Sequence, residues 1–174
     1  MKIYVACSLT CVPEDLFMQY SEHIKNIATV LAQESNTVVK YALKHSDPNL
    51  ASYSKAERPS LCYEWDRRMV EEADLVVAEA SFPSTGMGIE LQIANDNNTP
   101  ILLIYSDFWR NREAEKFYRT DDETRHQLQI GSGIVSIMVQ GLPMVKQELL
   151  YVNPATIEIE LKDALTTMYR QANE

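Results

Sequence analysis

Two kinds of hydrophobic pattern alternate along most of the chain. Short runs rich in Val, Ile, Leu and Tyr are typical of buried strands, and they lie at residues 2–8, 37–43, 74–80, 100–106 and 148–153. Longer segments repeat apolar residues every three or four positions, which predicts amphipathic helices, and they lie at residues 13–34, 60–73, 86–97 and 155–171. Strands that alternate with helices form a parallel sheet covered on both faces. We therefore expect a doubly wound, five-stranded α/β fold, with residues 1–174 forming a single domain.

Two polar segments interrupt this alternation. Residues 44–60 contain Pro48 and Pro59 and few apolar side chains, so we expect a loop there. Residues 106–127 are polar and aromatic, and the apolar pattern resumes only near residue 133. We expect the second segment to be an insert, and we favour a solvent-exposed helix over a ligand-binding element. In the alternative, the segment would offer side chains to a phosphate or a base, from among Arg110, Arg112, Arg119, Trp109 and Phe117.

The composition fits a soluble globular protein. The chain is 45% hydrophobic and 24% charged, with a formal net charge of −9. Such a charge disfavours broad binding to nucleic acids or anionic membranes, because both require a basic surface. Backbone N–H groups can still bind one phosphate of a small ligand. No run of about 18 apolar residues is present, and the N-terminus leads directly into a strand pattern, so we expect a cytoplasmic protein without a membrane segment.

Metal and thiol chemistry find little support in the pattern of residues. Cys7, Cys11 and Cys62 are odd in number and sparse, which fits a reducing compartment and offers no disulfide framework. The 3 histidines are scattered rather than clustered, as a zinc site would require. Cys7 ends a predicted strand, where packing or pocket lining is the more ordinary role of a cysteine.

The segment "PSTGMGIEL" at residues 83–91 is the strongest candidate for a ligand-binding loop. In open α/β sheets, ligands bind outside the carboxyl ends of the strands, and this segment follows one such end. Gly86 and Gly88 permit close approach of a ligand to the backbone, and the helix that follows favours an anion at its N-terminus. A nicotinamide-cofactor site is not supported, because the dinucleotide fingerprint requires a glycine where Leu91 stands.

Two acidic residues occupy helical faces that should be apolar. Glu90 shares a face with Met87 and Leu91, although its spacing fits a solvent-facing acid at a helix N-terminus equally well. Asp66 repeats the anomaly, because it shares a face with Met69 and Val70 on the preceding predicted helix. A carboxylate is costly to bury without a partner. Two such acids near strand ends therefore indicate a carboxylate pair around a cleft, as glycosyl transfer or glycoside hydrolysis requires.

Three segments resemble one known superfamily. "IYVACS", "EWDRRMVEEADLVVAEASFPSTGMGIELQIA" and "PILLIY" are similar to the nucleoside 2-deoxyribosyltransferases, and most similar to their Rcl-type branch, the 2′-deoxynucleoside 5′-monophosphate N-glycosidases. The resemblance covers most of residues 2–105 and a shorter piece near 134–141. It implies a flavodoxin-like fold, a small-molecule nucleotide or nucleoside substrate, and a homodimer or larger assembly. It also implies chemistry that needs no metal or organic cofactor.

The resemblance assigns roles to individual residues. Glu90 falls on the nucleophile that attacks the anomeric carbon, and Asp66, 24 positions earlier, falls on its companion acid. Ser136, in "VSIMVQG", falls on a serine that reaches the phosphate in the neighbouring subunit's site. The remaining substrate-binding positions lie in the first strand and in the phosphate-binding loop: Tyr4, Cys7, Ser8, Ser84, Gly86 and Gly88.

The first loop departs from the family pattern. Thr10 stands where the Rcl-type loop carries an arginine, which weakens the expectation of a phosphate, whereas Ser84 and Ser136 support it. Two rival functions stay open. One is a nucleoside 2-deoxyribosyltransferase, in which a second base replaces water, and the other is a nucleotide-binding module without turnover.

Overall fold

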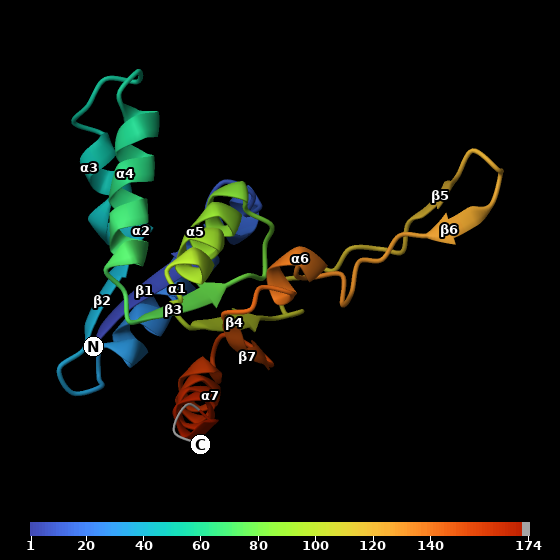
Figure 1. Cartoon of the computed structure of the whole chain (residues 1–174). Helices are drawn as coiled ribbons and strands as arrows, with labels where there is room; N and C mark the ends of the chain where they lie inside the picture. Colours follow the sequence, from blue (N-terminus) through green and yellow to red (C-terminus); the bar gives the residue numbers. More distant parts are fainter. Residues whose placement is uncertain (172–174) are drawn as a thin grey trace.

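Five parallel strands form a single sheet in the computed structural model, which describes residues 1–171 (Figure 1). The strands lie in the order β2-β1-β3-β4-β7. Their bounds are β1 Lys2–Cys7, β2 Val38–Tyr41, β3 Leu75–Glu79, β4 Ile101–Tyr105 and β7 Val145–Leu150. This order is the flavodoxin-like one, with a change of direction between β1 and β3. The predicted doubly wound fold is therefore confirmed.

Four long helices cover the two faces of the sheet: α1 Glu14–Leu31, α4 Arg58–Glu71, α5 Thr85–Asp96 and α7 Ile157–Gln171. Helices α1 and α7 pack on one face, against side chains such as Val5, Val77 and Leu102. Helices α4 and α5 pack on the other face, against the alternate positions Ala6 and Val76. Because successive side chains of a strand point to opposite faces, one apolar run supplies both cores.

The segment predicted as a loop at 44–60 is partly helical. It contains the second half of α2 Ala42–His45, all of α3 Asp47–Leu50, and the start of α4. Pro48 and Pro59 each occupy the second residue of a helix, where the missing N–H would have no intrahelical acceptor. The prolines therefore start helices here instead of marking a loop throughout.

The helix favoured for residues 106–127 is wrong. A short antiparallel hairpin forms there from β5 Phe117–Arg119 and β6 Arg125–Gln127, and it projects away from the sheet (Figure 1). Aromatic residues favour strands, and Glu123 closes the turn with a positive φ of 66°. Downstream, the short helix α6 Ile137–Gln140 precedes β7, which begins three residues before the predicted 148.

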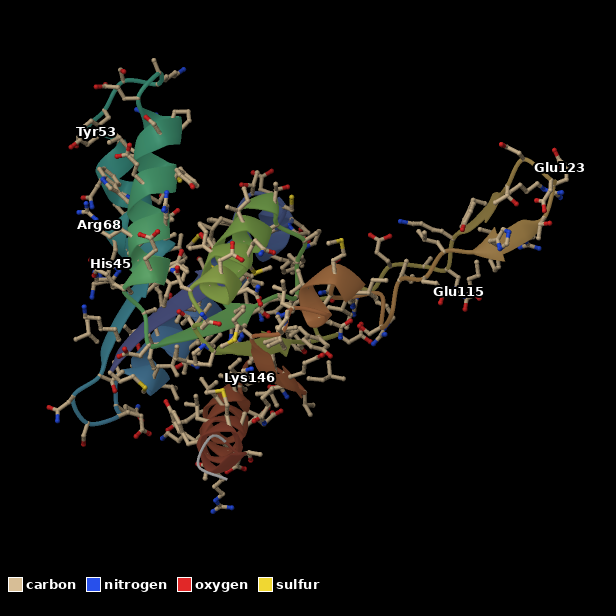
Figure 2. All side chains as sticks on the ribbon, viewed as in Figure 1. His45, Tyr53, Arg68, Glu115, Glu123 and Lys146 are labelled. Carbon is tan, nitrogen blue, oxygen red and sulfur yellow. The ribbon has the colours of Figure 1, made fainter. Side chains whose placement is uncertain are left out.

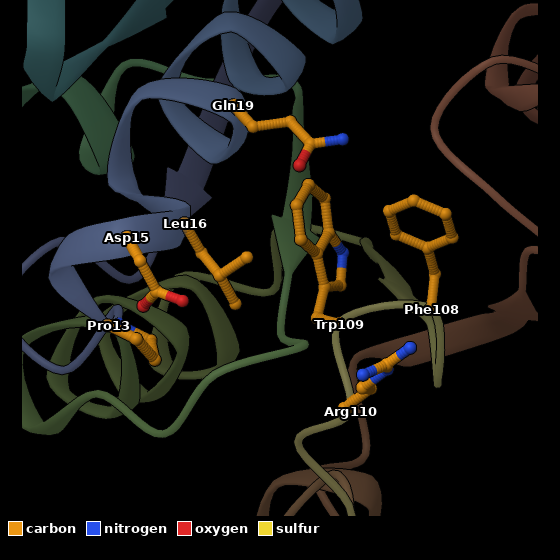
Figure 3. A pocket seen from close by; sticks show the side chains of 7 residues that line it. All are labelled: Pro13, Asp15, Leu16, Gln19, Phe108, Trp109 and Arg110. Atoms are coloured by element: carbon orange, nitrogen blue, oxygen red, sulfur yellow. The ribbon is translucent and has the colours of Figure 1, made fainter.

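Trp109 belongs to the core, although it lies in the same predicted insert. It is buried, and its Nε1 donates to the Tyr151 hydroxyl at 2.9 Å. Figure 3 shows Trp109 beside Phe108 and Arg110, facing the first turn of α1. Trp109 is therefore not available to stack on a base as an exposed ring would.

No helix among residues 1–171 is both long enough and apolar enough to cross a membrane.

Glu79, at the end of β3, is fully buried. Its carboxylate accepts hydrogen bonds from the hydroxyls of Tyr20, Ser81 and Tyr151. Burial raises the pKa of Glu79, and these donors oppose the rise. Ser81 also accepts from the backbone N–H of Ser106, at the end of β4. The side chain of Glu79 thus links α1, the ends of two strands and the segment after β7.

Removing this carboxylate should destabilise the fold. We expect Glu79→Ala to lower the free energy of unfolding by about 3 kcal/mol, because it leaves buried hydroxyls unpaired and opens a void. Chemical denaturation measures the change. Glu64→Ala, at an exposed position of α4, should change the same quantity by about 0.5 kcal/mol or less. Equal effects of the two substitutions would contradict this account.

Candidate active site

A cavity of about 280 Å³ lies at the carboxyl end of β1, between α4 and the N-terminus of α5. We call it the acid cavity. Its lining comes from the end of β1 and the loop after it, from α2 and α4, and from α5 with its N-cap residue: Cys7, Leu9, Thr10, Cys11, Ala42, Asp66, Ser84, Thr85, Gly86, Met87 and Glu90. Both sequence-predicted acids are in this set. No lysine or arginine lines the acid cavity among the residues that the structure describes.

Glu90 projects from the second turn of α5. Its Oε1 accepts a hydrogen bond from the Tyr4 hydroxyl at 2.9 Å. Its Oε2 is buried and has no hydrogen-bond partner within residues 1–171. Burial, followed by the negative charge of Asp66, raises the pKa of Glu90 to about 8, and the hydrogen bond from Tyr4 partly offsets that rise. Glu90 is therefore largely protonated at neutral pH.

Asp66 faces the same cavity from α4. Its Oδ2 accepts a hydrogen bond from the Cys62 thiol at 3.4 Å. Its Oδ1, like Oε2 of Glu90, is buried without a partner in the described part of the chain. A buried carboxylate oxygen normally has a partner. Two unsatisfied oxygens in one cavity are therefore well placed to contact a polar ligand.

Tyr4 and Cys7 stand close to the acids in different ways. Tyr4 is buried within β1 and does not line the cavity, so its hydroxyl contacts Glu90 from the side of the sheet and not from the cavity. Cys7 does line the cavity, and its pKa is raised by burial and then by the charge of Glu90. The Cys7 thiol is therefore neutral, and a neutral thiol is a poor nucleophile.

The N-terminus of α5 forms one wall of the acid cavity. Ser84 caps this helix, and its hydroxyl accepts a hydrogen bond from the Met87 N–H at 3.2 Å. Gly86 lines the acid cavity, whereas Gly88 lines a neighbouring cavity of about 330 Å³. A Cβ at Gly88 would have no atom within 4 Å. The two predicted glycines thus lie on different sides of the same helical turn.

Two predicted serines lie outside the acid cavity of their own chain. Ser8 is buried, and its hydroxyl donates to the Pro83 carbonyl at 3.0 Å, which joins the loop after β1 to the loop after β3. Ser136 caps α6 and lines the 330 Å³ cavity together with Ser84 and Gly88. Their predicted contacts with substrate stay predictions.

A larger cavity, of about 480 Å³, lies at the first turn of α1 (Figure 3). It is lined by Asp15 and Arg110 together with aromatic and apolar side chains. It holds a single acidic side chain, so it offers no carboxylate pair. We therefore place the chemistry in the acid cavity despite its smaller volume.

The described residues contain no group of three or more His, Cys, Asp or Glu side chains arranged to hold a metal ion.

Sequence reasoning missed Thr85 as a cavity residue. The contact of the Cys62 thiol with Asp66 also went unpredicted, although the two residues are four positions apart on one helix.

Comparisons with known proteins bear on this site. No family model matches the chain. Over 104 residues, it is 28% identical to a protein of Thermofilum pendens named "Putative 2′-deoxynucleoside 5′-phosphate N-hydrolase 1". This match covers 60% of this chain and 67% of that protein. Over 63 residues, it is 40% identical to a protein of the same name from Syntrophotalea carbinolica, covering 36% of this chain and 44% of the relative. The resemblance inferred from the motifs is confirmed. The second match spans less than half of that relative's length.

Solved structures agree on the fold. The Clostridium botulinum CMP N-glycosidase BcmB aligns with a TM-score of 0.57 and 16% identity, over 93% of this chain and 98% of the other. A conserved protein from Enterococcus faecalis V583 aligns with a TM-score of 0.56 and 16% identity, over 94% and 98%. At this level of identity, the likeness establishes the shared fold alone.

Proposed function

We propose that this protein hydrolyses the N-glycosidic bond of 2′-deoxynucleoside 5′-monophosphates, releasing the free base and 2-deoxyribose 5-phosphate. One observation carries the proposal: Glu90 and Asp66 line a single cavity, and each has a buried oxygen without a partner within residues 1–171. The names of the two relatives support the same activity and class of substrate.

Glu90 acts as the nucleophile in this proposal. An oxygen of the ionised carboxylate attacks C1′ of the sugar as the C1′–N bond breaks, and the bonding electrons leave with the base. The Asp66 carboxylate takes a proton from a water molecule and passes it to the departing base. The hydroxide that remains attacks C1′ while the C1′–Glu90 ester bond breaks. Both carboxylates return to their initial ionised states, and the net reaction consumes one water.

The phosphate would lie at the N-terminus of α5. The backbone N–H groups of its first turn favour an anion, and the hydroxyls of Ser84 and Thr10 line the same cavity. We propose that Ser136 of a neighbouring subunit adds a further hydroxyl. Binding energy from the phosphate would orient the sugar for attack, since remote contacts can be used at the reacting centre.

A substrate panel separates the candidate functions. Free base is measured by chromatography after incubation with ribo- and deoxynucleosides and their 5′-monophosphates. The proposal expects base release that depends on the 5′-phosphate and on the absence of a 2′-hydroxyl. Base exchange between thymidine and adenine, without a phosphate, would instead indicate a deoxyribosyltransferase. Nucleotide binding without base release over hours would indicate a silent binding module.

Tyr4 should tune Glu90 rather than touch the sugar. Tyr4→Phe removes the hydrogen bond that lowers the pKa of Glu90, so this pKa rises above about 8 and less of the nucleophile is ionised at neutral pH. We expect kcat at pH 7 to fall about tenfold, with the loss shrinking as the pH is raised. Tyr105→Phe is the matched control, because the Tyr105 hydroxyl donates to Glu148 away from the acid cavity. A loss that is constant with pH would mean that Tyr4 acts otherwise.

A further inference from the structure

The hairpin extends from the domain as a separate arm, which we define as residues 114–129. Figure 1 shows β5 and β6 projecting beyond the helical layers, and Figure 2 places Glu115 and Glu123 along the same projection. The two strands pair with each other through three registered residue pairs, centred on Tyr118 and His126. Within the described chain, no strand of the main sheet pairs with them.

The arm carries apolar and aromatic side chains that stay about half exposed in the described part of the chain. Phe117, Tyr118 and Leu128 are 49%, 51% and 44% exposed. On one face of the hairpin the Arg125 guanidinium lies 4.0 Å from the centre of the Phe117 ring, and on the other His126 stacks on Tyr118. An isolated two-stranded hairpin is marginally stable in water. An arm with two aromatic faces is therefore suited to packing against another surface.

The distribution of charge indicates the surface against which the arm packs. The acid cavity presents two carboxyl groups and, in the described chain, no lysine or arginine. The arm carries Arg125, which forms no ion pair within residues 1–171, whereas Lys116 and Arg119 pair with Glu113 and Glu123. A cation beside the phosphate would strengthen the binding of an anionic substrate at the α5 N-terminus. Arg125 has no carboxylate partner among the described residues, so its guanidinium can provide that cation.

The arm cannot reach the cavity of its own chain, but its length suits a second copy. No arm residue lines the acid cavity, and the arm points away from the α4 and α5 helices that enclose it (Figure 1). From residue 111 to the turn near residue 122, an extended chain spans about 35 Å at ~3.3 Å per residue. A domain of about 150 residues has a radius of gyration of only about 15 Å. The arm can therefore cross much of the surface of a second molecule.

We propose that the arm of one copy docks on a second copy of this chain, where Arg125 and Phe117 lie at the mouth of the acid cavity and Arg125 faces the phosphate of the substrate. The proposal rests on the proposed function for the identity of that anion. The arrangement is reciprocal in a two-fold dimer, since each copy gives one arm and receives one. Ile137 and Met138 of α6, close to the base of the arm, are 47% and 81% exposed and would extend the same interface.

Disulfide trapping tests the docking without any turnover. Cys11 is exposed and lines the acid cavity, so Arg125→Cys places a second thiol where the partner's Cys11 should meet it. Treatment with oxidised glutathione, which is reduced as the two thiols join, should give a covalent dimer on a non-reducing gel. A disulfide requires Cα atoms within about 7 Å. The dimer should disappear when Cys11→Ser is added, and Arg170→Cys on α7 should not form it.

Sedimentation of the wild-type protein and a mixing assay complete the test. We expect a dimer or larger assembly. Arg125→Ala should raise KM for a deoxynucleoside monophosphate about tenfold, while Arg170→Ala leaves KM unchanged.

In the mixing assay, Glu90→Gln is combined with a variant whose residues 115–128 are replaced by a short Gly–Ser turn. In a two-fold dimer, this mixture should recover about a quarter of wild-type activity, because half of the dimers carry one intact site.

A monomeric wild-type protein, or cross-linking that does not depend on Cys11, would overturn the docking. If cross-linking depends on Cys11 but the wild-type protein releases no base, the docking stands and the proposed function fails. If base is released but the mixture is no more active than its components, the arm does not complete the site.

Discussion

Glu90→Gln should abolish base release while nucleotide binding persists. The substitution keeps the shape of the side chain and an oxygen that can accept the hydrogen bond from Tyr4, but an amide cannot form the ester with C1′. We expect kcat to fall by about a thousandfold or more, as for loss of other nucleophiles. Quenched assays of free base measure the rate, and calorimetry measures the affinity for the deoxynucleotide, which should change by less than about tenfold.

Glu148→Gln is the matched control, because Glu148 also accepts from a tyrosine hydroxyl, that of Tyr105, but lies outside the acid cavity. Its kcat should equal that of the wild type. If Glu90→Gln retains most of its activity, Glu90 is not the nucleophile and the proposed mechanism fails.

Asp66→Asn should combine a large loss of rate with a displaced pH profile. Loss of the proton-transfer group should lower kcat about 100-fold. The negative charge of Asp66 is the second cause, after burial, of the raised pKa of Glu90. In the wild type, kcat/KM should rise with pH and level off above about 8, as Glu90 ionises. Without the charge of Asp66, the pKa of Glu90 falls, so the midpoint of this rise should move to lower pH.

Because Asp66→Asn should turn over slowly, the covalent intermediate can be sought in this variant. Mass spectrometry of peptides after acid quenching should find a deoxyribosyl phosphate adduct on the peptide that contains Glu90. An adduct on the α4 peptide of the wild-type protein would reverse the two roles. A pH profile that does not move in Asp66→Asn would show that the charges of the two acids are not coupled.

The sheet and the long helices could be predicted because each contributes one buried face to a core. Side chains such as Leu161 and Leu165 of α7 repeat at helical spacing and are buried. The one-turn helices α2 and α3 and the hairpin have no such face. They contain only four, four and three residues per element, which is too few for a period to emerge.

The candidate site could be predicted from the sequence only in part, for a similar reason. Glu90 and Asp66 stand out because they break an apolar helical face, and a break in a pattern is visible in one sequence. Glu79 breaks no pattern, since a strand end accepts a charge. Its burial depends on Tyr20 and Tyr151, which are 59 and 72 residues away along the chain. The hydrogen bond from Ser8 to Pro83 spans 75 residues and leaves no local signal either.

The raised pKa of Glu90 has a consequence for how substrate enters. With Glu90 neutral at pH 7, the empty cavity carries one negative charge fewer than its two carboxyl groups would suggest, so an anion meets less repulsion on arrival. The missing charge must then be restored before the bond to C1′ can form, and a proton has to be released to solvent. Each catalytic cycle thus includes deprotonation of Glu90 before C1′ is attacked. An anion bound beside Glu90 favours its neutral form, so binding near pH 8 should draw protons from the buffer, and the heat of binding should vary with the ionisation enthalpy of the buffer.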